Sequence, residues 1–447
     1  MKDLTKGSPG KVMLQFALPV AAGNIFQLFY SLADTRVVGS TLGESALAAV
    51  GATTSISTLF IGFLSGLTGG FALLTARSYG AGDEEKVRRY SAGCLLLGTL
   101  TSALLTLLCV AGLPFFLRVL NVPEALIPAA SGYIRIILFG MVMMMLYNAC
   151  ASILRALGDT AAPLAFLIFS SILNVFLDLF FILVLHRGVE GAAIATVLSQ
   201  SLSAVLSLVY MIKRYPVFRF HIRDFRITKG EVLKLYSAGI SMALMMSLVF
   251  FGTLSLQSAI NLLGTDIIVA HTAARKITEF FMLPFSVMGV TMANFCGQNM
   301  GACKTTRIHK GISQALVITS IWSVAMIFLS YTAAPGLVQL VTGTSDREIA
   351  GTAALYLKIN SVFYFVPAAI SIFRNALQGC GEHKTPVVSS FIELIGKVAI
   401  AAFLAPVLKY MGIIIAEPIV WVLMVIPLTV KIRKLYGSDK REIWRDM

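Results

Sequence analysis

Two apolar stretches of the chain carry polar side chains at helical spacing, and each of these stripes ends in an aspartate. The first stripe, with intervals of 3, 4 and 3 residues, is Asn24, Gln27, Ser31 and Asp34. The second, with intervals of 3 and 4, is Ser171, Asn174 and Asp178. At about 100° per residue, each set falls on one face of a helix. Two carboxylates brought together by such helices repel each other unless a proton or a cation joins them, so Asp34 and Asp178 indicate a site for H⁺ or Na⁺.

The helices that must position these side chains are indicated by the composition. Of the 447 residues, 57% are hydrophobic and 13% are charged, whereas a soluble domain is about 25% charged. The apolar residues form about twelve blocks of roughly 20 residues, the length that crosses a ~30 Å hydrocarbon core. The sequence therefore predicts an all-α polytopic membrane protein with twelve transmembrane helices. The expected spans are 12–38, 46–73, 91–113, 127–152, 163–186, 190–212, 235–263, 267–297, 312–334, 351–377, 386–408 and 411–430.

The cost of an acid in such surroundings favours a functional role for both aspartates. An ionisable side chain costs at least about 2.5–3.5 kcal/mol at the middle of a membrane helix. The asparagines and serines of the stripes have a second interpretation, in which they hydrogen bond across helices and hold the bundle together. In either case we expect the two stripes to face each other, or a wet cavity, within the first half of the chain.

Basic side chains gather in every second loop between the expected spans. The chain has 36 Lys and Arg against 22 Asp and Glu, a formal net charge of +14. Their alternation follows the positive-inside rule for cytoplasmic loops, which explains the excess better than nucleic-acid binding does. We expect a multi-pass protein of the plasma (inner) membrane with both termini cytoplasmic and no cleavable signal peptide. The six cysteines form no C-x-x-C pair, so neither a disulfide nor a metal site is expected, apart from a site for Na⁺.

The two halves of the sequence repeat short motifs in the same order. Leu42-Gly43 and Gly80-Ala81 recur 221 residues later as Leu263-Gly264 and Gly301-Ala302, and Gly158-Asp159 recurs 223 residues later as Gly381-Glu382. A duplicated six-span unit inserts the same way up, which predicts two six-helix lobes related by a pseudo-twofold axis along the membrane normal. The expected domains are an N-lobe with the ion site (1–212), a cytoplasmic basic linker (213–234), a C-lobe (235–430) and a cytoplasmic basic tail (431–447).

The second half lacks the acid stripes and has other intramembrane charges. Glu393 and Lys397 are four residues apart and can pair on one helix face, and their role is open between a structural ion pair and substrate binding or gating. We expect Glu279 to pair with Arg275 or Lys276, whereas the spacing identifies no partner for Glu417. A cluster with Met245, Met246 and Phe250 is read either as ordinary packing surface or as a compliant wall for varied apolar ligands.

Several of these segments resemble signatures of one transporter family. Ser31–Gly39, followed by Leu42-Gly43 and Ala46–Gly51, is similar to the first-helix signature of the multidrug and toxic compound extrusion (MATE) family. Gln298–Ala302 and Asn174–Asp178 are also similar to segments of that family. The resemblance extends over nearly the whole chain.

This resemblance implies a twelve-helix antiporter in which inward flow of H⁺ or Na⁺ drives the export of cationic amphipathic drugs. It assigns the coupling ion to Asp34, Asn174 and Asp178, with Thr196 and Tyr133 at two further polar positions of the N-lobe. Positions 236–263 and 351–377 contain no Asp or Glu, unlike one branch of the family, and this favours coupling through the N-lobe. Neither a cofactor nor an obligate protein partner is implied; the partners are the substrate and membrane lipid.

Our hypothesis for the mechanism is alternating access by rocking of the two lobes, with Pro19 as a hinge in the first helix. Asn24, Gln27 and Ser31 in the N-lobe, with the Met245 cluster, Glu393 and Lys397 in the C-lobe, are the candidates for the substrate cavity. The nearest alternative is a flippase of the same wider superfamily that moves a lipid-linked oligosaccharide. An intramembrane enzyme is disfavoured because no H-E-x-x-H motif occurs, and an ATP-driven pump because no G-x-x-x-x-G-K-[ST] loop occurs. The sequence does not choose between H⁺ and Na⁺.

Overall fold

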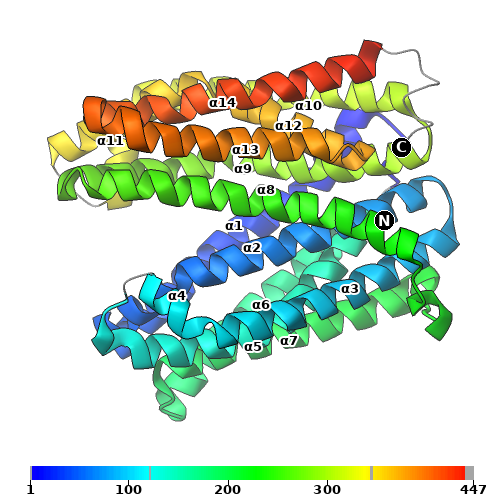
Figure 1. Ribbon diagram of the computed structural model, residues 1–447, viewed down its shortest axis with the longest axis horizontal. Coiled ribbons are helices and arrows are strands. Elements are labelled where there is room, and N and C mark those ends of the chain that lie inside the picture. Colours follow the sequence, from blue (N-terminus) through cyan, green and yellow to red (C-terminus); the bar gives the residue numbers. More distant parts are fainter. Residues whose placement is uncertain (1–2, 120–121, 343–345, 438–447) are drawn as a thin grey trace. The chain divides into compact units, whose positions relative to one another are not determined.

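The computed structural model describes residues 3–119, 122–342 and 346–437, and almost all of them are helical (Figure 1). By length and hydropathy, ten helices in these ranges qualify as membrane spans. The number is up to eleven when α11 (Arg347–Val362) and α12 (Phe365–Cys380), which are bent by 55°, count as one span. This all-helical architecture confirms the predicted fold class. The helices extend past the expected spans because their polar ends project beyond the apolar blocks.

The twelfth span comes from one overlong stretch. Lys384–Leu435 counts as a single helix of 52 residues, which at 1.5 Å per residue is about 78 Å, more than twice the hydrocarbon thickness. Lys409 interrupts it with a left-handed backbone, φ 50°. α13 (Lys384–Ala399) then packs beside α14 (Ala405–Gly437), as the orange and red ribbons show in Figure 1. The chain therefore crosses twice here, with the break between the expected spans 386–408 and 411–430.

The described chain divides into two compact units. Leu18–Ala243 forms nearly all of the first, and Leu4–Ala17 with Leu244–Met447 forms the second. These bounds differ from the predicted lobes 1–212 and 235–430, because the start of α1 packs with the second unit and the start of α8 with the first. The helices that cross these boundaries are α1 (Pro9–Leu42) and α8 (Lys229–Asn261).

The first unit is built around α2, which packs against α3 and α5, while α5 and α6 each pack against α7. Its further elements are α2 (Glu44–Gly80), α3 (Glu84–Ala111), α4 (Leu113–Val119), η1 (Glu124–Leu126), α5 (Ile127–Ala156), α6 (Ala161–Leu179), the π-helical η2 (Phe180–Val184) and α7 (Gly188–Arg214). The second unit has α9 in the corresponding place, in contact with α10, α11 and α12. Its remaining elements are α9 (Thr265–Gly301), α10 (Thr305–Thr342) and the π-helical η5 (Ile400–Leu404).

The duplicated motifs adopt the same backbone conformation in both units. Gly43 and Gly264 both precede a long helix with positive φ, 83° and 99°. Gly158 and Gly381 also have positive φ, 84° and 97°. A π-helical segment follows α6 in the first unit and α13 in the second. These pairs indicate that the repeated sequence motifs mark repeated structure.

Small residues let α8 approach α2 within the first unit. A Cβ added to Gly66 would lie 2.8 Å from the Cα of Ala243, and one added to Gly70 would lie 2.6 Å from the Cα of Gly239. Only glycine allows backbones to come this close, as in the G-x-x-x-G contacts of membrane helices. This contact explains why the first part of α8 belongs to the first unit.

The predicted linker, 213–234, is folded against α3 in the first unit. It contains two short 3-10 helices, η3 (Pro216–Phe218) and η4 (Ile222–Phe225). Arg88 Nε lies 3.0 Å from Asp224 Oδ1. Burial raises the pKa of Asp224, but the backbone N–H of His221 and the guanidinium of Arg88 outweigh it and hold this pKa below its usual value. The predicted tail, 431–447, begins as the end of α14, and its residues 438–447 lie outside the described ranges.

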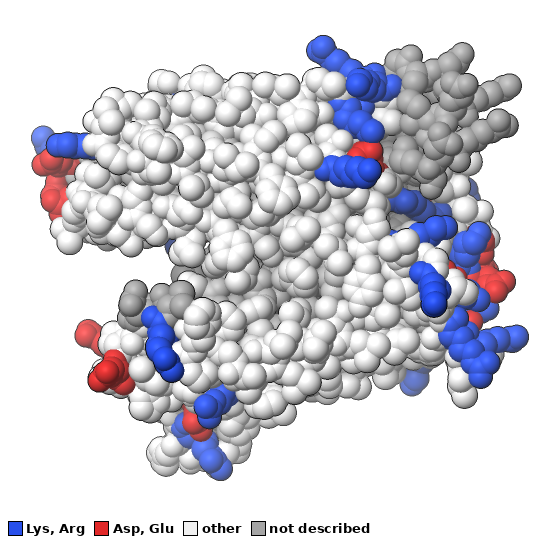
Figure 2. Space-filling model, in the orientation of Figure 1, with Lys and Arg blue, Asp and Glu red and all other residues white. Residues whose placement is uncertain are grey.

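The sides of the helices expose large apolar residues. Leu104 in the first unit is 57% exposed, and Phe328 in the second is 70% exposed. Between the helix ends, the surface in Figure 2 is almost free of Lys, Arg, Asp and Glu. Extended apolar surface of this kind is typical of a lipid-facing exterior, and with the long apolar helices it shows a multi-pass membrane protein.

Candidate functional site

The two predicted acids meet inside the first unit. Asp34 of α1 and Asp178 of α6 lie within hydrogen-bonding reach of each other. Asp178 is 0% exposed, and Asp34 is partly buried. Two carboxyl groups this close form a hydrogen bond only when one of them carries a proton, because two carboxylates repel. Oδ1 of each is buried and receives no hydrogen bond from a donor among the described residues, so the pair offers acceptor oxygens to a proton or a cation.

Asn174 connects the acid pair to the neighbouring helices. Its amide orientation follows from the surrounding hydrogen bonds. The NH₂ group donates to the hydroxyl of Tyr30 at 3.0 Å and to Asp178 Oδ2 at 2.9 Å, and the amide oxygen accepts from the backbone N–H of Thr196 at 3.1 Å. Asn174 is 1% exposed. Because it lies one turn before Asp178 on α6, a single helix face supplies both groups.

Two hydroxyl side chains complete this cluster. Thr196 of α7 hydrogen bonds through its side chain to Tyr30 of α1. Tyr133 of α5 lies near enough to both acids to interact electrostatically with them. The structure thus brings all five residues predicted for the ion site together, on four helices of the first unit. They are Asp34, Tyr133, Asn174, Asp178 and Thr196.

Tyr30 also belongs to the cluster, although it was not among the predicted site residues, and the sequence holds a signal for it. It lies four residues before Asp34, one helical turn away on the same face. The polar stripe that the sequence predicts runs instead through Asn24, Gln27 and Ser31. The structure leaves Gln27 and Ser31 exposed on α1 and Asn24 partly buried, so of the four residues in the stripe, Asp34 is the one that joins the cluster.

The second unit places its predicted residues in different surroundings. Glu393 and Lys397 form the expected pair on α13, with Lys397 Nζ 3.0 Å from Glu393 Oε1. Met245 is 3% exposed and contacts Gln378 through its sulfur, whereas Met246 is 50% exposed. Phe250 is half-buried and packs edge-on against its neighbour Phe251. Met245 is therefore packed inside the second unit and Met246 lies on its surface, and a wall of these side chains for varied apolar ligands stays a prediction.

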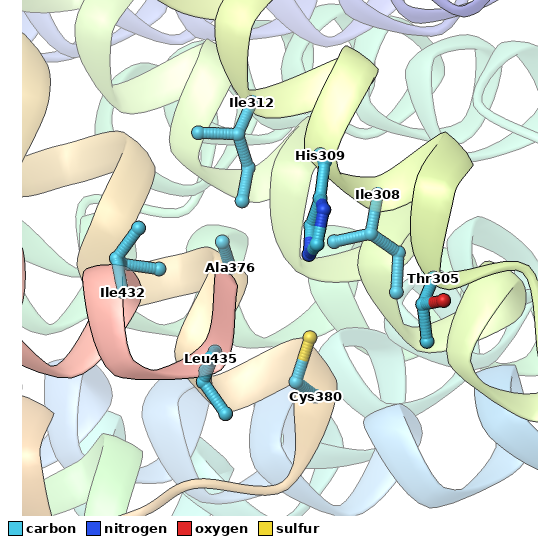
Figure 3. A pocket seen from close by; sticks show the side chains of 8 residues that line it. All are labelled: Thr305, Ile308, His309, Ile312, Ala376, Cys380, Ile432 and Leu435. Atoms are coloured by element: carbon cyan, nitrogen blue, oxygen red, sulfur yellow. The ribbon is translucent and has the colours of Figure 1, made fainter. Parts of the chain in front are cut away.

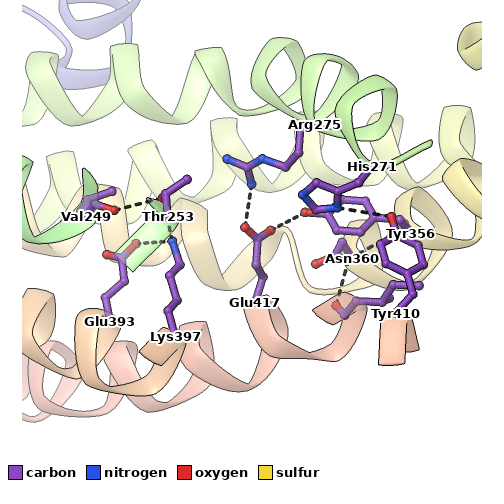
Figure 4. A network of polar contacts seen from close by, with 11 residues as sticks. Val249, Thr253, His271, Arg275, Tyr356, Asn360, Glu393, Lys397, Tyr410 and Glu417 are labelled. Carbon is purple, nitrogen blue, oxygen red and sulfur yellow. Dashed lines mark hydrogen bonds and ion pairs between the residues drawn. The ribbon is translucent and has the colours of Figure 1, made fainter. Parts of the chain in front are cut away.

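A buried polar network in the second unit was not predicted (Figure 4). Arg275 of α9 lies 2.6 Å from Glu417 of α14, and Tyr356 of α11 donates to the other oxygen of this carboxylate at 2.6 Å. Glu417 therefore has a partner that the spacing did not identify. Glu279 lies 3.8 Å from Lys276, as expected, in an exposed pair. Arg275 is thus held by Glu417, 142 positions away along the chain.

A small, mostly apolar pocket marks one end of the second unit (Figure 3). Thr305 of α10, Cys380 of α12 and Leu435 of α14 are among the residues that line it. The start of α10 thus meets the ends of α12 and α14. The segment before α1 binds near the start of α10, because Lys304 Nζ donates to the carbonyl of Thr5 at 3.0 Å. The beginning of α1 and the end of α14 therefore share one end of this unit.

Comparison with known proteins identifies the family. A family model described as MatE matches residues 19–180 and again 241–403. The probable multidrug resistance protein YpnP of Bacillus subtilis is 30% identical over 315 residues, 68% of each chain, and the FAD transporter of Shewanella oneidensis is 24% identical over 436 residues, 95% of each. A solved outward-facing multidrug resistance MATE family transporter of the MOP superfamily shares the fold, with a TM-score of 0.89 and 23% identity over 98% of both chains. Because the family model covers most of the sequence, this chain belongs to the MATE family of membrane transporters.

Proposed function

We propose that this chain is a secondary active antiporter that exports amphipathic drugs or other toxic organic compounds in exchange for H⁺ or Na⁺. The observation that carries the proposal is the buried pair Asp34 and Asp178, whose carboxyl groups lie within hydrogen-bonding reach. Relatives named as multidrug resistance proteins support export as the direction. The alternative, a flippase for lipid-linked oligosaccharides, is not favoured, because the relatives carry names of drug exporters and the proposed ion site is acidic.

The coupling would operate through the charge of the acid pair. A proton or Na⁺ that binds there compensates one of the two negative charges and removes the repulsion between the carboxylates, which otherwise opposes closure of the pair. Asp34 and Tyr30 are both on α1, so a change in this cluster acts directly on that helix. Leu4–Ala17 belongs to one unit and Leu18 onward to the other, and Pro19, which lacks a backbone N–H, follows this junction directly. We therefore propose Pro19 as the hinge at which α1 bends during alternating access.

The test is uptake of a fluorescent organic cation into inverted membrane vesicles, with a pH gradient and a Na⁺ gradient imposed separately. Wild-type protein should accumulate the dye under at least one gradient, and that gradient identifies the coupling ion. Asp34→Asn should abolish gradient-driven uptake while the purified protein stays monodisperse. Glu44→Gln, at an exposed acid on α2, is the matched control and should transport normally. Full transport by Asp34→Asn would refute the proposed site.

We further propose the plasma (inner) membrane as the location, with both termini in the cytoplasm. The distribution of Lys and Arg over the loops follows the positive-inside rule and supports this orientation. It is also supported by the second unit, in which the beginning of α1 and the end of α14 lie at the same end. The proposed partners are amphipathic cations and membrane lipid, with no cofactor, nucleic acid or obligate protein partner. One relative is named as an FAD transporter, so membership of the family does not by itself restrict the substrate to cations.

A further inference from the structure

Two cysteine thiols meet inside the second unit, on different helices. Cys296 lies near the end of α9, and Cys380 is the last residue of α12. Their side chains lie within hydrogen-bonding reach of each other, and both are free thiols. They are 0% and 4% exposed. The pair forms because α9 packs against α12, so no spacing in the sequence indicates it.

A glycine lets the two helices come this close. A Cβ added to Gly379 would lie 2.9 Å from the Cβ of Cys296 and 3.1 Å from the backbone nitrogen of Gly297. The backbone of α12 therefore runs directly against α9 at this level, as small residues allow in membrane helices. Cys380 is the next residue after Gly379, so the packing of the two backbones places its thiol beside that of Cys296.

The pocket at this end of the second unit gives a ligand access to the pair. Cys380 is one of the residues that line it, and its sulfur is directed into the pocket (Figure 3). Most of the other lining side chains are aliphatic, Ile308, Ile312 and Leu435 among them. A small molecule that enters therefore meets the thiol of Cys380 in apolar surroundings, with the thiol of Cys296 within reach behind it.

We propose that Cys296 and Cys380 form a dithiol site for trivalent organic arsenicals with a small apolar group, such as methylarsonous acid. Trivalent arsenic is pyramidal, so the two sulfurs that it binds lie about as far apart as two thiols in hydrogen-bonding contact. A soft ion that favours two thiolates in a straight line, such as Cu⁺, would have to push the sulfurs apart. The methyl group on arsenic would lie against the aliphatic wall of the pocket.

The reaction at this site is a condensation in which nothing is oxidised or reduced. Two S–H bonds of the protein and two As–OH bonds of methylarsonous acid break, two As–S bonds form, and two molecules of water leave. The first As–S bond forms at Cys380, which faces the pocket. The second, at Cys296, forms within the same complex, so the bridge is far more stable than a single bond. The site uses neither the acid pair nor an ion gradient, so the inference does not rest on the proposed antiport function.

The experiment titrates the reduced, purified full-length protein with methylarsonous acid and measures the retained arsenical by intact mass spectrometry after desalting. Wild-type protein should retain one CH₃As group per chain in place of two protons, and an excess of a small dithiol should remove it. Peptide mapping should find the group between the peptides that contain Cys296 and Cys380. Cys296→Ser and Cys380→Ser should each weaken binding by about a hundredfold or more, because the second bond is lost.

Two control variants remove other thiols. Cys303→Ser removes an exposed cysteine, and Cys94→Ser removes a thiol of the first unit that is as buried as that of Cys296. Both should bind the arsenical as wild type does. The arsenical should also raise the midpoint of thermal unfolding of wild-type protein, but not that of Cys380→Ser, because it binds the folded pair.

Two outcomes would overturn the inference. One is that wild-type protein retains no arsenical, and the other is that the bridge maps to other cysteines. Both are measured on the unaltered chain, so they stay decisive even if a serine variant folds poorly.

Discussion

Arg307 donates from both Nε and Nη2 to the carbonyl oxygen of Leu4, at 3.2 and 3.1 Å, although 303 residues separate them. Asn299 donates to the same oxygen at 3.1 Å, and the backbone N–H of Leu4 donates to Gln298 Oε1 at 3.0 Å. Leu4 is 0% exposed. Gln298 and Asn299 are the first residues of the segment Gln298–Ala302 that resembles the family, so this motif fixes Leu4 to the second unit.

Loosening this attachment should free the start of α1. Arg307→Gln removes the guanidinium donors that hold the carbonyls of Leu4 and Lys6, so the backbone amides of residues 4–17 should exchange hydrogen faster, by about tenfold or more for the loss of charge-assisted bonds. Hydrogen–deuterium exchange with mass spectrometry measures this directly. Arg433→Gln, at an exposed arginine of α14, serves as the control. If exchange in residues 4–17 is the same in Arg307→Gln as in wild type, the attachment does not depend on Arg307.

The parts of the fold that the sequence predicted depend on local patterns. The length of an apolar block and the 3–4 spacing of polar residues are set within one helix, so the spans and the stripes ending in Asp34 and Asp178 could be read directly. Their meeting required only that the first and fifth spans pack in the same unit. Lys409 interrupts an apolar block, and this was enough to place the break between the last two spans.

The features that were missed depend on packing between distant segments. Nothing in the spacing relates Arg275 to Glu417, because 142 positions and several helices separate them. The same holds for Leu4 and Arg307. The boundary between the two units inside α8 could not be predicted either, since it follows from the backbone contact at Gly66 and Gly70. The predicted boundary was the linker 213–234, which was identified from its charge alone. Sequence periodicity shows which face of a helix carries the polar or the apolar side chains, but it does not show which other helix that face contacts.

The ion pair between Arg275 and Glu417 should show strong energetic coupling. Arg275→Met or Glu417→Leu alone leaves a charge unpaired in apolar surroundings, at a typical cost of about 3–5 kcal/mol. The double variant removes both charges, so it should be more stable than either single variant. Thermal unfolding of the purified proteins, arranged as a double-mutant cycle, measures the coupling energy. Additive effects of the two changes would mean that the pair contributes no interaction energy.

The two carboxyl groups of the acid pair should share a proton when no other cation is bound. The carboxyl groups of Asp34 and Asp178 lie within hydrogen-bonding reach, and repulsion disfavours two carboxylates at that separation. Infrared difference spectra of the wild-type protein against Asp178→Asn should therefore show the carbonyl stretch of a protonated carboxyl group. Glu44→Gln should leave this band unchanged. Loss of the band when Na⁺ is added at constant pH would identify Na⁺ as a competing ligand, and its absence in wild-type protein without Na⁺ would contradict the shared proton.

The close approach of α2 and α8 gives a test within a single helix. Gly62 and Gly70 lie two helical turns apart on α2, but a Cβ at Gly62 meets nothing within 4 Å, whereas one at Gly70 would lie 2.6 Å from the Cα of Gly239. Gly70→Ala should therefore destabilise the protein by about 1–3 kcal/mol, the usual cost of overpacking, because the backbone of α8 must shift. Gly62→Ala should be neutral or slightly stabilising, since alanine favours the helix over glycine. Thermal unfolding monitored by size-exclusion chromatography compares the two variants, and equal midpoints would show that the helices do not pack this closely.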